Sequence, residues 1–169
     1  MADARPFHWE YHPEQPAPQA FRIEGGRPLQ GTVHVSGAKN AALKLMAAAV
    51  LTGERCRFEN MPEIEDVRVM AAVLTDLGVV VDHPAPGVYE VAAGDVDWLF
   101  VPLEAAAKMR ASFILLGPLL TRFGRVIISN PGGDRIGRRP VNLHVDAMRA
   151  LGAEVTYRNG YYFAQAPGR

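Results

Sequence analysis

The apolar positions after residue 36 switch between two periods, and they predict helices and strands in a definite order. In "AKNAALKLMAAAVLT", helical spacing places Leu43, Met46 and Val50 on one face, and Gly53 ends that helix. Short apolar runs predict a strand in "RCRFEN" and a strand pair in "VVVDH" and "VYEVA", joined across "PAPG". Between them, "MPEIEDVRVMAAVLTDLG" predicts a second helix with Gly78 at its C-cap.

The same order of elements recurs in the second half of the chain. A helix is predicted in "KMRASFILLGPLLT", a strand in "RVIISNP", a helix in "VNLHVDAMRALG" and a strand pair in "AEVTY" and "YYFAQA". The halves match at a nearly constant offset, which pairs Lys39 with Lys108, and Gly78 with Gly152. This self-similarity predicts an α/β fold built from a duplicated unit of helix, strand, helix, strand, strand. Because two copies leave an open side, we expect a further copy or domain outside this chain.

The residues before position 36 predict a tail and two short strands. Residues 1–20 are rich in Pro, charge and His without an apolar period, and they predict a disordered extension. His8, Trp9 and His12 could form a metal or stacking site there, but the tail interpretation is favoured. Alternating apolar residues on either side of a Gly-Gly pair predict two strands within 21–35.

Composition and charge narrow the function classes. The chain has 169 residues, is 49% hydrophobic, and carries 18 basic and 18 acidic residues for a formal net charge of +0. This is typical of a soluble globular domain or part of one, and argues against a general nucleic-acid binder. The single cysteine, Cys56, excludes an internal disulfide, suits the cytoplasm, and is expected to be a buried small hydrophobe. No apolar run is long enough to span a bilayer, so we expect no membrane partner.

Three stretches carry candidate chemistry. "SGAKNAAL" places Lys39 and Asn40 at a helix start, which favours anions, although a capped helix with a solvated lysine fits equally well. "KMRASF" places Arg110 near another helix start, where a cation needs an anionic ligand or an acidic neighbour. In "ISNPGGDRIGRRP", Gly132 and Gly133 permit positive φ and close approach to a ligand, and the arginines can bind phosphate or carboxylate. A surface loop in which Asp134 balances these arginines is the alternative.

Together, "LQGTVHVSGAKNAAL", "MRASFILLGPLLTRFG" and "NPGGDRIGRRPVNLH" resemble the N-terminal part of the UDP-N-acetylglucosamine 1-carboxyvinyltransferase family, over residues 21–169. The resemblance implies an inside-out α/β barrel of repeated units, two domains of three copies each, and an active site between them. Residues 36–169 would supply two repeats of the first domain, and 21–35 would supply strands of the otherwise absent second domain. The implied reaction moves the enolpyruvyl group of phosphoenolpyruvate to the 3'-hydroxyl of UDP-N-acetylglucosamine and releases phosphate. This is the first committed step of peptidoglycan synthesis, and it uses no cofactor and no metal.

The resemblance also assigns residues. Lys39 and Asn40 match a pair that contacts phosphoenolpyruvate, and Arg110 matches an arginine at the nucleotide-sugar site. Asp134 takes the position of a loop cysteine that acts as proton donor, which implies insensitivity to fosfomycin. The segment that lines the UDP-sugar site is matched by Arg139, Pro140, Val141, Asn142 and Leu143, although the family more often has Asp in place of Asn142.

Two other functions stay open on the sequence. One is the shikimate-pathway enolpyruvyl transferase, which shares the fold but typically has Lys-Ser where this chain has Lys-Asn. The other is a truncated, non-catalytic relic that binds nucleotide sugar. Under the hypothesis of a UDP-N-acetylglucosamine enolpyruvyl transferase, we expect this chain to be a fragment that is inactive alone.

Overall fold

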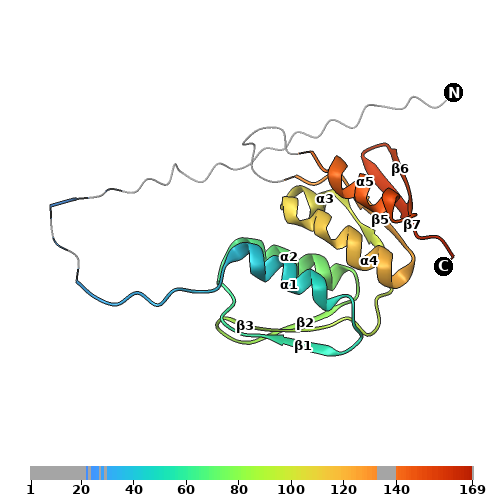
Figure 1. The fold of residues 1–169 in the computed structure, drawn as a ribbon. Coiled ribbons are helices and arrows are strands. Elements are labelled where there is room, and N and C mark those ends of the chain that lie inside the picture. Colours follow the sequence, from blue (N-terminus) through green and yellow to red (C-terminus); the bar gives the residue numbers. More distant parts are fainter. Residues whose placement is uncertain (1–21, 23, 27, 29, 133–139, 169) are drawn as a thin grey trace, which may run out of the picture. The chain divides into compact units, whose positions relative to one another are not determined.

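The computed structural model describes residues 22, 24–26, 28, 30–132 and 140–168 of the chain (Figure 1). The chain divides into two compact units, Met1–His34 and Val35–Arg169. The described residues of the first unit contain no helix or strand, so the strands expected within 21–35 are not observed there. A strand is stable only beside a hydrogen-bonding neighbour, and the resemblance places that neighbour in sequence outside this chain.

The first copy of the repeat begins the second unit. It consists of α1 (Lys39–Ala49), β1 (Arg55–Phe58), α2 (Glu65–Asp76), β2 (Val80–Ala85) and β3 (Val88–Ala92). The strands form an antiparallel sheet in the order β1-β3-β2, and α1 and α2 lie on one face of it (Figure 1).

The second copy repeats this arrangement. It consists of η1 (Arg110–Leu115), α4 (Leu116–Phe123), β5 (Arg125–Ser129), α5 (Asn142–Ala150), β6 (Glu154–Arg158) and β7 (Tyr161–Gln165). The strand order β5-β7-β6 is again antiparallel, so it matches β1-β3-β2 strand for strand. Gly78 and Gly152 follow the two matched helices with φ of 90° and 94°, in the left-handed region that glycine adopts most easily. The predicted duplication and the predicted helix stop at Gly78 are therefore confirmed, and Gly152 ends the matched helix in the same way.

Two features differ from the predicted elements. The single helix predicted over 108–121 is a 3-10 turn, η1, followed by the α-helix α4. Pro118 explains the break, because it has no N–H to donate to the preceding turn and fits only the first turn of an α-helix. A short strand, β4 (Phe100–Val101), and a helix, α3 (Leu103–Ala107), lie between the copies, and β4 pairs in parallel with β5. Both are too short to show an apolar period.

One apolar cluster lies between the helices and the sheets. Leu43, Met46 and Val50 of the α1 segment are 2% exposed or less, so the predicted inner face of α1 is confirmed. Cys56 on β1 is only partly buried and packs against this cluster, so the expected burial is incomplete. The reason is that β1 is an outer strand of its sheet. Within the described part of the chain, no helix is long and apolar enough to cross a membrane.

Candidate functional site

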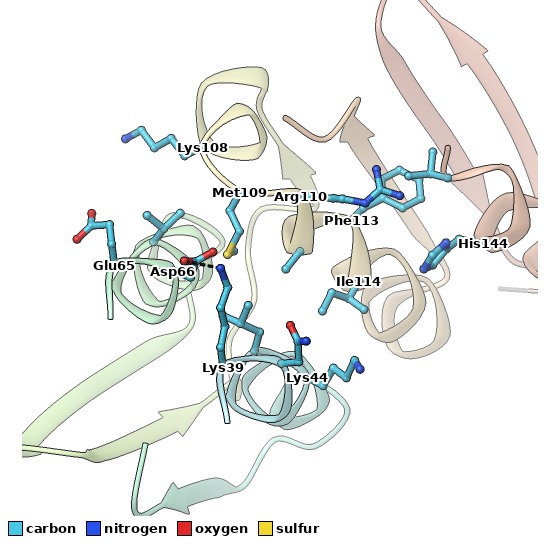
Figure 2. Close-up of a pocket in the computed structure, with 15 residues that line it drawn as sticks. Lys39, Lys44, Glu65, Asp66, Lys108, Met109, Arg110, Phe113, Ile114 and His144 are labelled. Carbon is cyan, nitrogen blue, oxygen red and sulfur yellow. Dashed lines mark ion pairs between the residues drawn. The ribbon is translucent and has the colours of Figure 1, made fainter. Parts of the chain in front are cut away.

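The starts of several helices meet around a hollow of about 350 Å³ (Figure 2). α1 begins there with Lys39, α2 with Glu65 and η1 with Arg110, while Val141 precedes α5. None of α1, α2 and α5 has a side chain that caps its first turn, and the N-terminal N–H groups of a helix favour anions. The hollow is lined by Lys39, Asn40, Leu43, Lys44, Glu65, Asp66, Val69, Lys108, Met109, Arg110, Ala111, Phe113, Ile114, Val141 and His144.

The backbone before α1 fixes where Lys39 lies. The N–H of Gly37 donates to the carbonyl oxygen of Asn60 at 2.9 Å, just after β1. A Cβ on Gly37 would overlap that oxygen, so only glycine allows this close approach. α1 starts two residues later, and the Nζ atom of Lys39 lies 2.8 Å from Oδ2 of Asp66 on α2.

Arg110 and Gly132 make hydrogen bonds at the two ends of residues 133–139, the part of "ISNPGGDRIGRRP" that contains its arginines. Arg110 donates from Nη2 to the carbonyl oxygen of Pro140 at 3.0 Å, two residues before α5 begins. Gly132 donates from its N–H to the carbonyl oxygen of Ala106 at 2.9 Å, and a Cβ there would overlap the carbonyl oxygen of Ala107. Gly132 does not adopt positive φ, and the glycine is needed here for close packing against α3.

The charge of the hollow suits an anion. Four lysine or arginine side chains line it against two carboxylates, and one of these carboxylates, Asp66, is paired with Lys39. The other, Glu65, lies 3.7 Å from Arg68 on its own helix. Positive side chains beside helix N-termini that no side chain caps favour the binding of phosphate and carboxylate groups.

The structure brings some of the expected site residues together and separates others. Lys39, Asn40, Arg110 and Val141 all line the hollow. Pro140 and Asn142 line a second hollow of about 500 Å³ beside Tyr157 and Tyr162, which Val141 also borders. Leu143 is 75% exposed and lines neither hollow. Asp134 and Arg139 lie outside the described residues.

Sequence reasoning missed Asp66, Lys44, Lys108 and His144, which also line the first hollow. The signal for Asp66 was its place in the first turn of a predicted helix, next to Glu65. Acidic residues are common there because they complement the helix dipole, so nothing marked Asp66 as a partner for Lys39. His144 lies edge-on to Phe113, with ring centroids 5.9 Å apart.

The displaced carboxyl pKa values belong to the first sheet and its turn, away from the hollow. Glu63 accepts a hydrogen bond from the N–H of Gly87 at 2.6 Å, which lowers its pKa, and His83 adds to this effect. Hydrogen bonds from Arg57 and Arg55 lower the pKa of Glu90 on β3. None of these groups lines the hollow. Among the described residues, no three His, Cys, Asp or Glu side chains gather as a metal site would require.

Comparison with known proteins gives a consistent set of relatives. A family model described as EPSP synthase (3-phosphoshikimate 1-carboxyvinyltransferase) matches residues 23–169. A UDP-N-acetylglucosamine 1-carboxyvinyltransferase from Acidiphilium cryptum is 46% identical over 147 residues, which is 87% of this chain and 35% of that protein. Proteins of the same name from Sulfurovum sp. and Caulobacter vibrioides are 44% and 47% identical, over 88% and 86% of this chain. The chain spans about a third of the length of these relatives.

Solved structures show the fold. The enolpyruvyl transferase NikO from Streptomyces tendae has a TM-score of 0.73 at 24% identity, over 86% of this chain and 32% of that one. An EPSP synthase from Acinetobacter baumannii has a TM-score of 0.58 at 16% identity, over 81% of this chain and 32% of that one. The expected α/β fold of enolpyruvyl transferases is therefore confirmed, as part of a larger structure.

Proposed function

The chain belongs to the EPSP synthase family, and on that basis we propose that it is part of a UDP-N-acetylglucosamine enolpyruvyl transferase. The complete protein would transfer the enolpyruvyl group of phosphoenolpyruvate to the 3'-hydroxyl of UDP-N-acetylglucosamine and release phosphate. The relatives of that name, at 44–47% identity, favour this acceptor over shikimate 3-phosphate. The observation that carries the chemistry is the basic hollow at the helix starts, since both substrates are anions.

The residues at the hollow suit the two substrates. We assign Lys39 and Asn40 to phosphoenolpyruvate, and Arg110 to the nucleotide sugar. The reaction adds a hydroxyl to C2 of phosphoenolpyruvate while C3 gains a proton, and phosphate then leaves. Fixed cations stabilise the charge that develops on phosphate and carboxylate during these steps. The segment that would line the UDP-sugar site is Arg139, Pro140, Val141, Asn142 and Leu143.

Asp134 is assigned as the group that delivers the proton to C3. A carboxylic acid can do this when its surroundings keep it protonated until the substrates are bound. Since the resemblance gives UDP-N-acetylglucosamine enolpyruvyl transferases a cysteine at this position, a carboxylate here would remove the thiolate that fosfomycin alkylates. The complete protein should then be active but insensitive to fosfomycin.

The repeat supports a place for the chain in the complete protein. We propose that residues 36–169 are two of three repeats in the first domain, and that residues 21–35 are strands of the second. The proposed reaction opens peptidoglycan synthesis, so the complete protein would serve cell-wall formation and, through it, cell shape and division.

Acceptor specificity tests the proposal. The complete protein is incubated with phosphoenolpyruvate and either UDP-N-acetylglucosamine or shikimate 3-phosphate, and phosphate release and product mass are measured. We expect phosphate and an enolpyruvyl adduct with the nucleotide sugar alone. Turnover with shikimate 3-phosphate alone would place the protein in the other branch of the family. Binding of the nucleotide sugar without phosphate release would indicate a non-catalytic relic.

A further inference from the structure

We infer that Asp66 is a positioning residue that holds the ammonium group of Lys39 at the hollow, and that this contact sets how well the site uses phosphoenolpyruvate. The consequence for catalysis rests on the proposed function. The contact itself concerns only this chain, and it can be tested without turnover.

Without a partner, the side chain of Lys39 would favour a solvated position outside the hollow. It is the first residue of α1, and Ala38 before it provides no side-chain cap, so positive helix charge faces the lysine. Its side chain is 49% exposed and has four rotatable bonds, which favours a solvated ammonium group. Instead, Nζ lies 2.8 Å from Oδ2 of Asp66, and Figure 2 shows the two side chains pointing toward each other from α1 and α2.

Asp66 is well placed to provide this anchor. It lies in the first turn of α2, where the helix dipole stabilises a carboxylate, and its side chain is only 32% exposed. Its neighbour Glu65 has a similar position in sequence but is 77% exposed and lies 3.7 Å from Arg68, three residues further on. The two carboxylates therefore differ in role: Glu65 makes an ordinary surface pair within α2, whereas Asp66 joins α2 to α1.

The other basic groups at the hollow repel the ammonium group of Lys39, so its ion pair with Asp66 is needed to hold it there. Lys44, Lys108, Arg110 and His144 line the same space as Lys39. Without Asp66, these groups and the start of α1 would favour the movement of Lys39 into solvent. With Asp66 present, the ammonium group is already in place when an anion arrives, so less side-chain entropy is lost on binding. The remaining cations keep the hollow attractive to phosphate.

A simple charge effect predicts the opposite result, which makes the inference testable. If Asp66 only reduced the positive potential, its replacement by Asn would strengthen phosphoenolpyruvate binding and lower that KM. If Asp66 positions Lys39, Asp66→Asn should lower kcat/KM for phosphoenolpyruvate by about tenfold or more and leave KM for the nucleotide sugar within about twofold. Asp66→Glu keeps the charge on a longer stem and should restore part of the loss.

The experiment uses the complete protein and a matched control. Asp82→Asn makes the same chemical change at another paired aspartate, since Asp82 lies 2.6 Å from Arg55 on the first sheet, away from the hollow. It should leave both KM values and kcat unchanged. If Asp66→Asn lost activity together with a lower melting temperature, and Asp66→Glu rescued neither, Asp66 would only stabilise the fold. That result would overturn the inference.

A second readout does not depend on turnover. Acetylation of lysines by acetic anhydride is followed by peptide mass spectrometry, with Lys44 as the internal reference. We expect Asp66→Asn to raise the labelling of Lys39 relative to Lys44 by severalfold, and to weaken the protection of Lys39 by inorganic phosphate. Unchanged labelling and protection would overturn the inference even if the transferase activity is confirmed. If the wild-type protein is inactive with both acceptors, the proposed function fails, and this labelling still decides the role of Asp66.

Discussion

At the scale of single residues, Asp134 offers the sharpest test of the proposed chemistry. Alkylation by fosfomycin requires a thiolate nucleophile, and a carboxylate is a far weaker one towards an epoxide. We expect the complete protein to keep its activity in fosfomycin, and Asp134→Cys to become covalently modified. Phosphate release in the presence of fosfomycin measures the first outcome, and intact mass after incubation with UDP-N-acetylglucosamine and fosfomycin measures the second.

Cys56 provides an internal control for this experiment. It is partly buried on β1 and packs against the apolar cluster, so it should carry no adduct in the unmodified sequence. An adduct on that sequence, or an Asp134→Cys variant that is active but unmodified, would contradict the assignment of position 134.

The residues of the hollow show what a sequence can and cannot predict about a site. Lys39, Asn40 and Arg110 were found because each stands in a local motif at a helix start, and the structure places all three at one hollow. Asp66 was not found, because its contact with Lys39 joins two helices and depends on their packing. Local sequence does not encode that geometry, and an aspartate in a first turn already has a sufficient local reason.

At the scale of elements, the sequence predicted most of the second unit. Each helix and strand of the first copy lies close to its predicted position, because Gly78 ends α2 and the end of "PAPG" turns the strand pair. The helix α1 is shorter than predicted, since it ends at Ala49 and not at Gly53. The β2 strand continues to Ala85, closer to the turn than predicted, with an irregular register after Asp82. The prediction failed at β4, a strand of two residues that exists through its pairing with β5. Such a strand has no pattern of its own.

Arg122 links elements of the two copies, and its removal should destabilise the chain. Its Nη1 atom lies 2.9 Å from the carbonyl oxygen of Val50, 2.8 Å from that of Thr52 and 2.6 Å from that of Ala93. Arg122→Met would leave these partly buried carbonyls of the first copy without a charged donor, at a cost of about 2 kcal/mol or more. We expect the melting temperature of the chain to fall by roughly 4–8 °C in a thermal melt followed by circular dichroism.

The control for this prediction is Arg158→Met, at the exposed end of β6. An exposed arginine away from such contacts should change the free energy of unfolding by about 0.5 kcal/mol at most. If both variants melted at the same temperature as the original chain, the contacts of Arg122 would contribute nothing to the joining of the copies. The offset between the two copies pairs Arg122 with Gly53 of the first copy. A Cβ at Gly53 would lie 3.2 Å from the Nη2 atom of Arg122, so the glycine leaves room for this side chain.

At the scale of the whole molecule, the sheets of the two copies differ at one edge. In the second sheet β4 pairs with the edge of β5 that faces away from β7, whereas the equivalent edge of β1 has no strand beside it among the described residues. Leu45 and Leu51, in and just after α1, are also exposed. Both features agree with the expectation that further sequence, as found in the longer relatives, completes the structure.

The last prediction concerns the share of its relatives' length that the chain covers. The 169-residue chain contains the basic hollow, but it spans about a third of the relatives that it resembles. Transfer between two substrates requires both to be held in reacting geometry, and the loss of that positioning removes a large part of the rate enhancement. The isolated chain should therefore release no phosphate above background from phosphoenolpyruvate and UDP-N-acetylglucosamine, while the complete protein does so under the same conditions. Phosphate release by the isolated chain that depends on both substrates would show that the two copies described above already contain a working site.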